Sequence, residues 1–436
     1  MKCESIKQFR QEIYATLDKG KEAVFELMDA VLLSQKVSSF AELSLSPVFR
    51  RKWSSIYECL ADNRPMAKRQ RKVLIKQIPT VERILLAGDH TAWGRREAKT
   101  LKDRTYEHGA KVVSGKPITV GHGYSTIAWI PEEKGSWALP LCHQRITSFE
   151  NPLKRAAFQL KQICKNLSQR PLSLWDSEYG CAKFVQQTAD IAADKILRLR
   201  PNLCLWQAPP PYSGKGRPRE HGDKFKLSDT ATWPDAIESQ EIDDPVWGTI
   251  EMKRWSQLHF RQSARIEMEL ILIQRKGDSL KLEQLKPIWL AALLETPLPL
   301  AEYWSLYQKR FAIDHWYRFA KQRLHWTIPQ FQNLHSSERW SDLMPLLTWQ
   351  LWLAREIVED IPLPWQKPQA SDSLTPGRVA QSIGGVLAVI GTPTSVPKPR
   401  GKSLGCPQGQ QRLRKIRYPV VKKRFSPKKK KATNSS

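Results

Sequence analysis

A change of hydrophobic period near residue 80 constrains the fold of this chain more than any other feature. In residues 1–76, apolar side chains recur every three or four positions, as in the stretch FRQEIYATLDKGKEAVFELMDAVLL. This spacing predicts an all-helical N-terminal domain. From about residue 81, short β-branched and apolar runs bounded by Gly, Pro and charged residues alternate with helical stretches. That alternation predicts an α/β fold.

The α/β region contains enough strand signals for a mixed five-stranded sheet with flanking helices. The predicted strands lie within residues 83–90, 116–130, 137–146, 170–180 and 194–206. The first three follow one another without an intervening helix, so we expect them to form an antiparallel meander. Helical stretches at 152–167 and 182–193 precede the fourth and fifth strands.

Composition and spacing predict four further boundaries. Residues 208–262 open on PPPYSGKGRPREHG and read as a mostly β insertion, which divides the α/β core into 77–207 and 263–365. The run Leu300–Trp326 contains no Gly or Pro and predicts one long helix, followed by a second at 342–360. Residues 366–436 read as a basic, disordered tail, because the last 64 residues contain no acid and are rich in Pro, Gly and Ser.

The charge balance points to a polyanionic partner. The chain has 70 Lys plus Arg against 43 Asp plus Glu, a formal net charge of +27. Its hydrophobic content of 41% is too high for a disordered chain, and no apolar run is long enough to span a bilayer. The N-terminus lacks a signal-peptide pattern, so we expect a cytoplasmic protein with no membrane partner. The seven cysteines show no paired spacing and are expected to be reduced.

Three basic segments are candidate phosphate contacts, each with a plainer alternative. Residues 64–76 contain six Lys or Arg and no acid, as a phosphate-binding arm or a solvated linker would. Lys215, Arg217 and Arg219 form a thin basic ribbon suited to a minor groove, or an ordinary basic loop. Fourteen Lys or Arg between 398 and 431 would bind DNA or RNA phosphates in a salt-dependent way.

Two aspartates stand where catalytic carboxylates are often placed. Asp89 follows the apolar run ILLAG on the first strand, and Asp176 follows LSLW on the fourth. A carboxylate in such a setting is costly unless it is paired, hydrogen-bonded or metal-bound. Two cations clamped around a phosphate need acids on rigid elements. Each aspartate alone could equally be a helix cap or a turn residue.

The predicted long helix carries a polar stripe with a specific composition. At about 100° per residue, Tyr307, Arg310, Asp314 and Lys321 fall within roughly 60° of one another. The opposite face is apolar and suited to packing on a sheet. Asp314 is the single carboxylate between Glu302 and Glu338. A solvated face with an Asp–Arg pair is the plainer interpretation.

Asp89, Asp176 and the series Tyr307-x2-Arg310-x3-Asp314-x6-Lys321 together resemble the DDE insertion-sequence transposases that carry the Tyr-Arg-Glu-Lys signature. The resemblance covers roughly residues 80–355. It implies a ribonuclease H-like core with a mostly β insertion between the second and third acids. It also implies a DNA transposase that acts on terminal inverted repeats and target double-stranded DNA, as a homodimer on paired ends.

The resemblance implies roles for individual residues. Asp89, Asp176 and Asp314 would bind two Mg²⁺ or Mn²⁺ ions. Tyr307, Arg310 and Lys321 would hold phosphates of the terminal nucleotides. By location in the insertion, Trp247 and Trp255 are candidates to stack on a flipped base, although a core role suits each at least as well.

One position departs from the family pattern, because Asp314 stands where the signature has Glu. Its carboxylate reaches about 1.5 Å less far from the helix. Either the helix lies closer to the sheet in an active three-aspartate site, or the site is weakened; we favour the active site. Two alternatives remain, a related nuclease or resolvase, and a non-catalytic DNA-binding derivative of a transposase.

Overall fold

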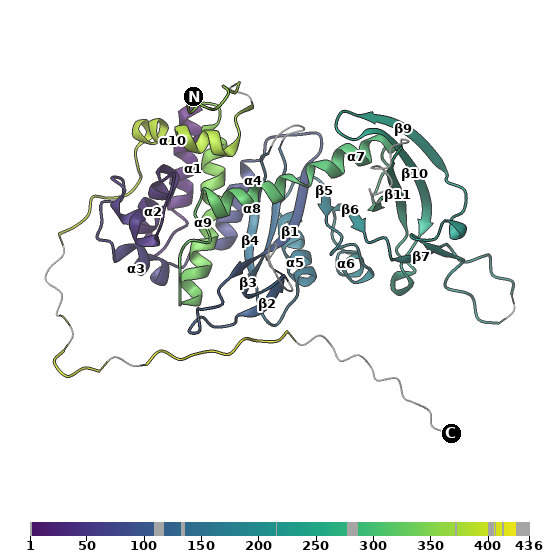
Figure 1. Cartoon of the computed structure of the whole chain (residues 1–436), viewed down its shortest axis with the longest axis horizontal. Helices are drawn as coiled ribbons and strands as arrows, with labels where there is room; N and C mark the ends of the chain where they lie inside the picture. Colours follow the sequence, from purple (N-terminus) through teal and green to yellow (C-terminus); the bar gives the residue numbers. More distant parts are fainter. Residues whose placement is uncertain are drawn as a thin grey trace.

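The computed structural model describes most of the chain as a mixed α/β molecule (Figure 1). The described residues are 2–108, 117–131, 136–214, 216–276, 287–370, 373–399, 405, 407–411 and 414–423. Within these ranges, no helix combines the length and the apolar character needed to cross a bilayer.

Four α-helices and one 3₁₀ helix occupy the N-terminal region, as the periodicity predicts. They are α1 (Lys2–Tyr14), α2 (Lys21–Leu33), the 3₁₀ helix Phe40–Leu45, α3 (Ser55–Asp62) and α4 (Ala67–Lys76). Most of the basic run 64–76 lies on α4 rather than in a linker. Lys68, Arg69 and Lys72 are exposed there, whereas Arg71 is buried and reaches Gln162 at 3.4 Å.

The five predicted strands are present and form the predicted antiparallel and parallel pairs. They are β1 (Leu85–Gly94), β3 (Ile118–Trp129), β4 (Leu139–Ile146), β5 (Leu172–Trp175) and β6 (Asp194–Leu199). Their order in the sheet is β4-β3-β1-β5-β6, with β1, β3 and β4 antiparallel and β1, β5 and β6 parallel. This arrangement is compatible with a ribonuclease H-like fold.

Helices cover the sheet where the sequence places them. α5 (Pro152–Cys164) and α6 (Ala182–Gln187) precede β5 and β6, and α5 packs on β3. α9 (Leu334–Ala354) packs on β4 and is itself covered by α1 and α3. The stacked rings of Trp129 and Trp349, with centroids 5.9 Å apart, join β3 to α9.

The insertion 208–262 contains strands but no α-helix, and its longer strands extend the core sheet. β7 (Cys204–Trp206) and β8 (Lys224–Lys226) form a small hairpin of their own. β9 (Glu238–Asp244) and β10 (Gly248–Leu258) continue through β11 (Met268–Arg275) and β12 (Ile288–Leu293) to β6. With β2 (Thr105–His108) at the other edge, one ten-stranded sheet results, a continuity that the sequence did not reveal.

The prediction of one long helix at 300–326 was wrong. The chain instead forms α7 (Leu300–Lys309) and α8 (Ala312–Gln322), joined by a tightened turn in which Arg310 and Phe311 bond back three residues. Long-range contacts explain the break, because the two halves are held by different parts of the sheet. α7 contacts β9 and β10, whereas α8 contacts β1.

The prediction of a disordered tail from residue 366 was also wrong in part. Residues Pro376–Ile390 form α10, which packs on α2 and α9. Its buried residues Val379, Ile383 and Leu387 recur every four positions and line one face. The absence of acid and the paired glycines hid this apolar stripe, whose stability depends on tertiary packing rather than on helix propensity.

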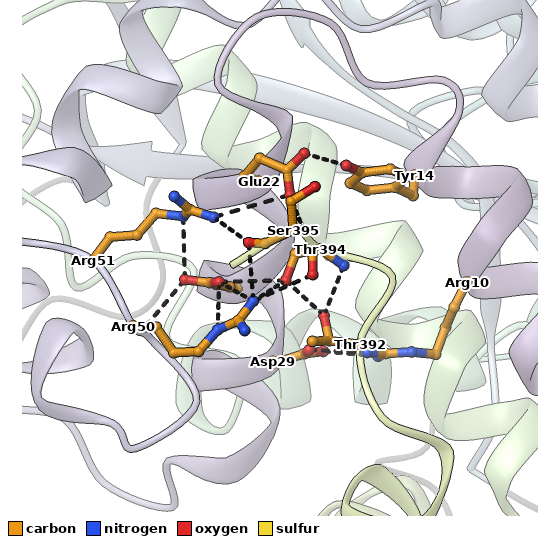
Figure 2. Close-up of polar contacts among 10 residues, drawn as sticks. Arg10, Tyr14, Glu22, Asp29, Arg50, Arg51, Thr392, Thr394 and Ser395 are labelled. Carbon is orange, nitrogen blue, oxygen red and sulfur yellow. Dashed lines mark hydrogen bonds and ion pairs between the residues drawn. The ribbon is translucent and has the colours of Figure 1, made fainter. Parts of the chain in front are cut away.

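After α10, the chain is anchored to the N-terminal region by polar contacts (Figure 2). The Ser395 amide donates to the Glu22 carboxylate at 2.7 Å, and Arg50 Nη2 donates to Thr394 Oγ1 at 2.6 Å. Beside them, Arg10 Nη1 pairs with Asp29 at 2.7 Å. Residues 391–395 are therefore part of the folded molecule.

Candidate active site

Two neighbouring parallel strands in the interior of the sheet carry the first two predicted acids. β1 and β5 pair in parallel with Gly88 opposite Trp175, so Asp89 and Asp176 follow at equivalent positions. Gly88 permits this register, because a Cβ there would lie 2.1 Å from the ring of the buried Trp175. Asp176 is half-buried and accepts a hydrogen bond from the backbone N–H of Ser177.

Asp89 lies in the most strongly perturbed environment of the three acids. Burial raises the pKa of its carboxyl group to about 7. The negative charges of Asp314 and Asp176 also raise it, whereas the His90 backbone N–H and the Arg310 charge lower it. The three predicted aspartates therefore share one electrostatic environment, centred on Asp89.

Arg310, in the turn between α7 and α8, interacts with all three aspartates. Its side chain is 5% exposed, and its Nη2 atom lies 3.2 Å from the carboxylate of Asp314, which is 44% exposed. Burial alone would lower the pKa of Arg310, but its neighbours Tyr307, Asp314, Asp176 and Asp89 together raise it. Its Nε atom is buried and has no hydrogen-bond partner among the described residues.

Tyr307 and Lys321 lie on either side of this centre. Tyr307 is buried, and its pKa is raised first by that burial, with Asp176 among the charges that contribute. Lys321 Nζ donates to Thr91 Oγ1 at 2.7 Å, two residues beyond Asp89 on β1. Burial lowers the pKa of Lys321, and the Asp89 charge opposes that shift. Lys321 of α8 thus reaches β1, whereas Tyr307 lies on α7, before the break in the predicted helix.

Several neighbouring residues were not predicted as part of the site. The buried Tyr317 hydroxyl donates to the main-chain oxygen of Asp89 at 2.9 Å, although the helical wheel assigned Tyr317 to the apolar face. His90 Nδ1 lies 3.1 Å from the Tyr179 hydroxyl, and His90 Nε2 lies 3.7 Å from Glu178. Glu178 and Tyr179 could have been suspected from the sequence, because they follow Asp176 closely in the run Asp-Ser-Glu-Tyr after β5.

A groove of about 890 Å³ opens beside these residues. It extends from Thr91 and Lys321, next to Asp89, toward the β2 edge of the sheet. Its wall also includes Asn151, which caps the N-terminus of α5. A groove of this kind beside clustered carboxylates is a candidate substrate channel.

A family model described as DDE superfamily endonuclease matches residues 12–259, more than half of the chain. The chain belongs to this family of DDE superfamily endonucleases. The matched segment contains most of the N-terminal helices, Asp89 and Asp176, and it ends before Asp314. No curated protein matches the chain.

DDE endonucleases generally use divalent metal ions, and the donor chemistry of the site fits such ions. Hard carboxylate oxygens are the ligands that Mg²⁺ prefers. A bound cation would oppose the desolvation, and the smaller repulsion from Asp314 and Asp176, that raise the pKa of Asp89. The described residues nevertheless contain no group of three His, Cys, Asp or Glu side chains arranged to hold a metal ion. Arg310 supplies positive charge among the three acids.

Other predicted DNA contacts of this DDE endonuclease lie elsewhere. Arg217 and Arg219 are exposed on the loop between β7 and β8, where Arg217 pairs with Glu220 at 3.2 Å; Lys215 lies outside the described residues. Trp255 is buried and donates to the Pro234 carbonyl, so a core role fits it.

Trp247 is half-buried against Trp304, with ring centroids 4.7 Å apart. This contact fits a packing role between the insertion and α7.

Proposed function

We propose that this DDE endonuclease is a DNA transposase of an insertion sequence, which cleaves the ends of its element and joins them to target DNA. The observation that carries the proposal is the environment of Asp89. The half-buried Asp89 carboxyl, 14% exposed, has its pKa raised to about 7 by loss of solvent, and the charges of Asp314, Asp176 and Arg310 also act on it. Strongly perturbed carboxyls clustered beside a groove are typical of catalytic sites.

Two Mg²⁺ or Mn²⁺ ions held by Asp89, Asp176 and Asp314 would supply activation of the attacking oxygen and charge neutralisation at the leaving oxygen. The protein side chains bind and orient the DNA. Among the described residues, the buried Nε donor of Arg310 has no hydrogen-bond partner, and we propose that it turns to a phosphate oxygen when DNA binds. Lys321, held toward β1 by Thr91, offers a point charge for a second phosphate.

The shorter acid at position 314 is compatible with this proposal. α8 contacts β1 directly, and the Tyr317 hydroxyl reaches the main chain of Asp89. The helix is therefore held close to the strand that carries the first acid. We propose that this closeness compensates for the missing methylene of Asp314.

The proposed partners are double-stranded DNA at the terminal inverted repeats and at the target. The net charge of +27 favours binding to a polyanion. A homodimer on paired element ends is proposed from the family resemblance alone.

The test is cleavage of labelled DNA that contains the gene with its native flanks, by purified protein with Mg²⁺ or Mn²⁺. We expect metal-dependent cuts at the flanks for the native protein, and a loss of at least about a thousandfold in rate for Asp89→Asn. Asp190→Asn is the matched control, because Asp190 is 65% exposed and pairs with Lys161 at 2.6 Å outside the site. Equal cutting by Asp89→Asn and the native protein would refute the proposal.

One observation favours a second candidate, a non-catalytic DNA-binding derivative. Arg310 pairs with Asp314, and no three-residue metal cluster forms in the described parts of the chain. In that case, DNA would bind tightly and remain intact with the native protein and with Asp314→Glu alike. Metal-dependent cuts without preference for the flanks would instead indicate a related nuclease or resolvase.

A further inference from the structure

The C-terminal segment 414–423, here called the C-terminal arm, returns to the sheet beside the candidate active site. Its Tyr418 amide donates to the Lys99 carbonyl at 2.8 Å, and its Val421 amide donates to the Arg104 carbonyl at 2.8 Å. Val421 also forms a parallel bridge with Thr105 of β2. The arm therefore lies beside β2 and is joined to it by a single β-bridge.

The arm is held mainly by polar contacts. Its residues are exposed or half-buried, and Ile416 is 68% exposed, so little apolar surface is buried. The arm carries five basic residues and no acid among the described positions, namely Arg414, Lys415, Arg417, Lys422 and Lys423. Such docking is expected to be reversible and sensitive to charge.

The arm ends in a half-buried ion pair at the wall of the groove. Lys423 Nζ lies 2.9 Å from Glu107 Oε1, with the two side chains 15% and 9% exposed. Glu107 occupies space left by Gly123, where a Cβ would lie 2.8 Å from its carboxylate. Both Glu107 and Lys423 line the groove that reaches Lys321.

The docked arm sets the charge of the groove. Among the described residues outside the arm, the groove is lined by two basic residues, Arg96 and Lys321, and by two acids, Glu107 and Glu178. Its wall would then be neutral, with a buried carboxylate that repels phosphate. Lys423 neutralises Glu107 and leaves the wall with one net positive charge.

We propose that the docked C-terminal arm is one wall of a DNA-binding groove, and that this groove holds the sugar-phosphate backbone of duplex DNA on its way to the three aspartates. The inference rests on the proposed function, in which DNA is the substrate. Phosphate fits the remaining lining, because Lys321, Arg96 and the N-terminus of α5 all favour an anion.

The experiment measures binding of a fluorescently labelled random-sequence duplex to the full chain, in chelator and over a range of salt. Lys423→Met is expected to weaken binding about three- to tenfold at low salt, and to reduce the salt slope by about 0.9. Adding Glu107→Gln should restore the affinity, because the wall regains its net positive charge. Lys161→Met is the matched control, since Lys161 is 47% exposed, pairs with Asp190 and does not line the groove.

Three outcomes would overturn the inference. They are an unchanged affinity in Lys423→Met, a higher affinity, which would mean that the arm competes with DNA, and a loss that Glu107→Gln does not restore. Because the assay contains no metal and no cleavage step, its result is separate from that of the cleavage test. If the native protein cuts DNA and the Lys423→Met variant binds DNA as tightly as the native protein does, the proposed function stands and this inference fails.

Discussion

At the scale of single residues, burial has opposite effects on the acids and bases around the candidate site. It raises the pKa of Asp89 to about 7 and lowers the pKa of His143 to about 3. His143 is fully enclosed, stacks on Tyr124 at 5.1 Å, and has its Nδ1 atom 2.8 Å from Thr126 Oγ1. The folded structure therefore favours the neutral form of His143, which lies on β4.

This shift predicts sensitivity of the fold to acid. Below its ordinary pKa of 6.5, the His143 ring gains a proton in the unfolded chain but not in the folded one, until the pH approaches 3. The free energy of unfolding should therefore decrease as the pH is lowered from 6.5 toward 3. At about pH 5, this residue alone should account for a decrease of about 2 kcal/mol. Urea unfolding at a series of pH values, for the native protein and for His143→Gln, measures the difference.

The control for His143 is His335→Gln, because the His335 side chain is 62% exposed. His122, whose pKa burial lowers to about 4, is common to all three proteins and cancels in the comparison. An equally steep fall in the native protein and in His143→Gln would contradict the prediction.

At the scale of elements, the candidate site depends on how α8 is attached to β1. The Tyr317 hydroxyl donates to the main-chain oxygen of Asp89 and lies 2.8 Å from Thr126 Oγ1, so one side chain joins the helix of the third acid to the strand of the first. On α7, which ends before the turn at Arg310, Trp304 Nε1 donates to Asp244 of β9 at 2.8 Å. Tyr317 is a positioning residue on this account.

Tyr317→Phe should therefore lower the cleavage rate more than it lowers DNA affinity. Loss of the hydrogen bond should also cost about 1 kcal/mol of unfolding free energy. Cleavage rate, duplex affinity and urea unfolding are measured together, with Tyr57→Phe as the control, because Tyr57 lies on α3 and is 40% exposed. A rate equal to that of the native protein would show that Tyr317 does not position the site.

The elements that local pattern determines were predictable, and those that distant contacts determine were not. The position of Asp176 directly after β5 follows from an apolar run that ends in an acid, whereas β1 continues beyond Asp89 to Gly94, so the prediction that the first strand ends at Asp89 was wrong. No Gly or Pro marks the break between α7 and α8 at Arg310. The break arises because α7 and α8 contact different strands of the sheet. Glu107 and Lys423 are 316 positions apart, and no sequence periodicity connects them.

At the scale of the whole molecule, one continuous sheet joins the regions that the sequence separated into core and insertion. It runs from β2, beside the C-terminal arm, through β1 and β5 at the candidate site, to β9 in the insertion (Figure 1). Residues 392–395 contact the N-terminal region (Figure 2), and Val421 of the C-terminal arm contacts the β2 edge. The acid-free C-terminal region is thus partly built into the fold, which its composition concealed.

The central claim is that Asp89, Asp176 and Asp314 form one site for divalent metal. The most direct test is calorimetric titration of the purified full chain with Mn²⁺, for the native protein, Asp89→Asn and the exposed control Asp190→Asn. The account predicts saturable Mn²⁺ binding by the native protein and by Asp190→Asn, and a loss of at least about tenfold in affinity for Asp89→Asn. Equal Mn²⁺ binding by Asp89→Asn and the native protein would contradict it.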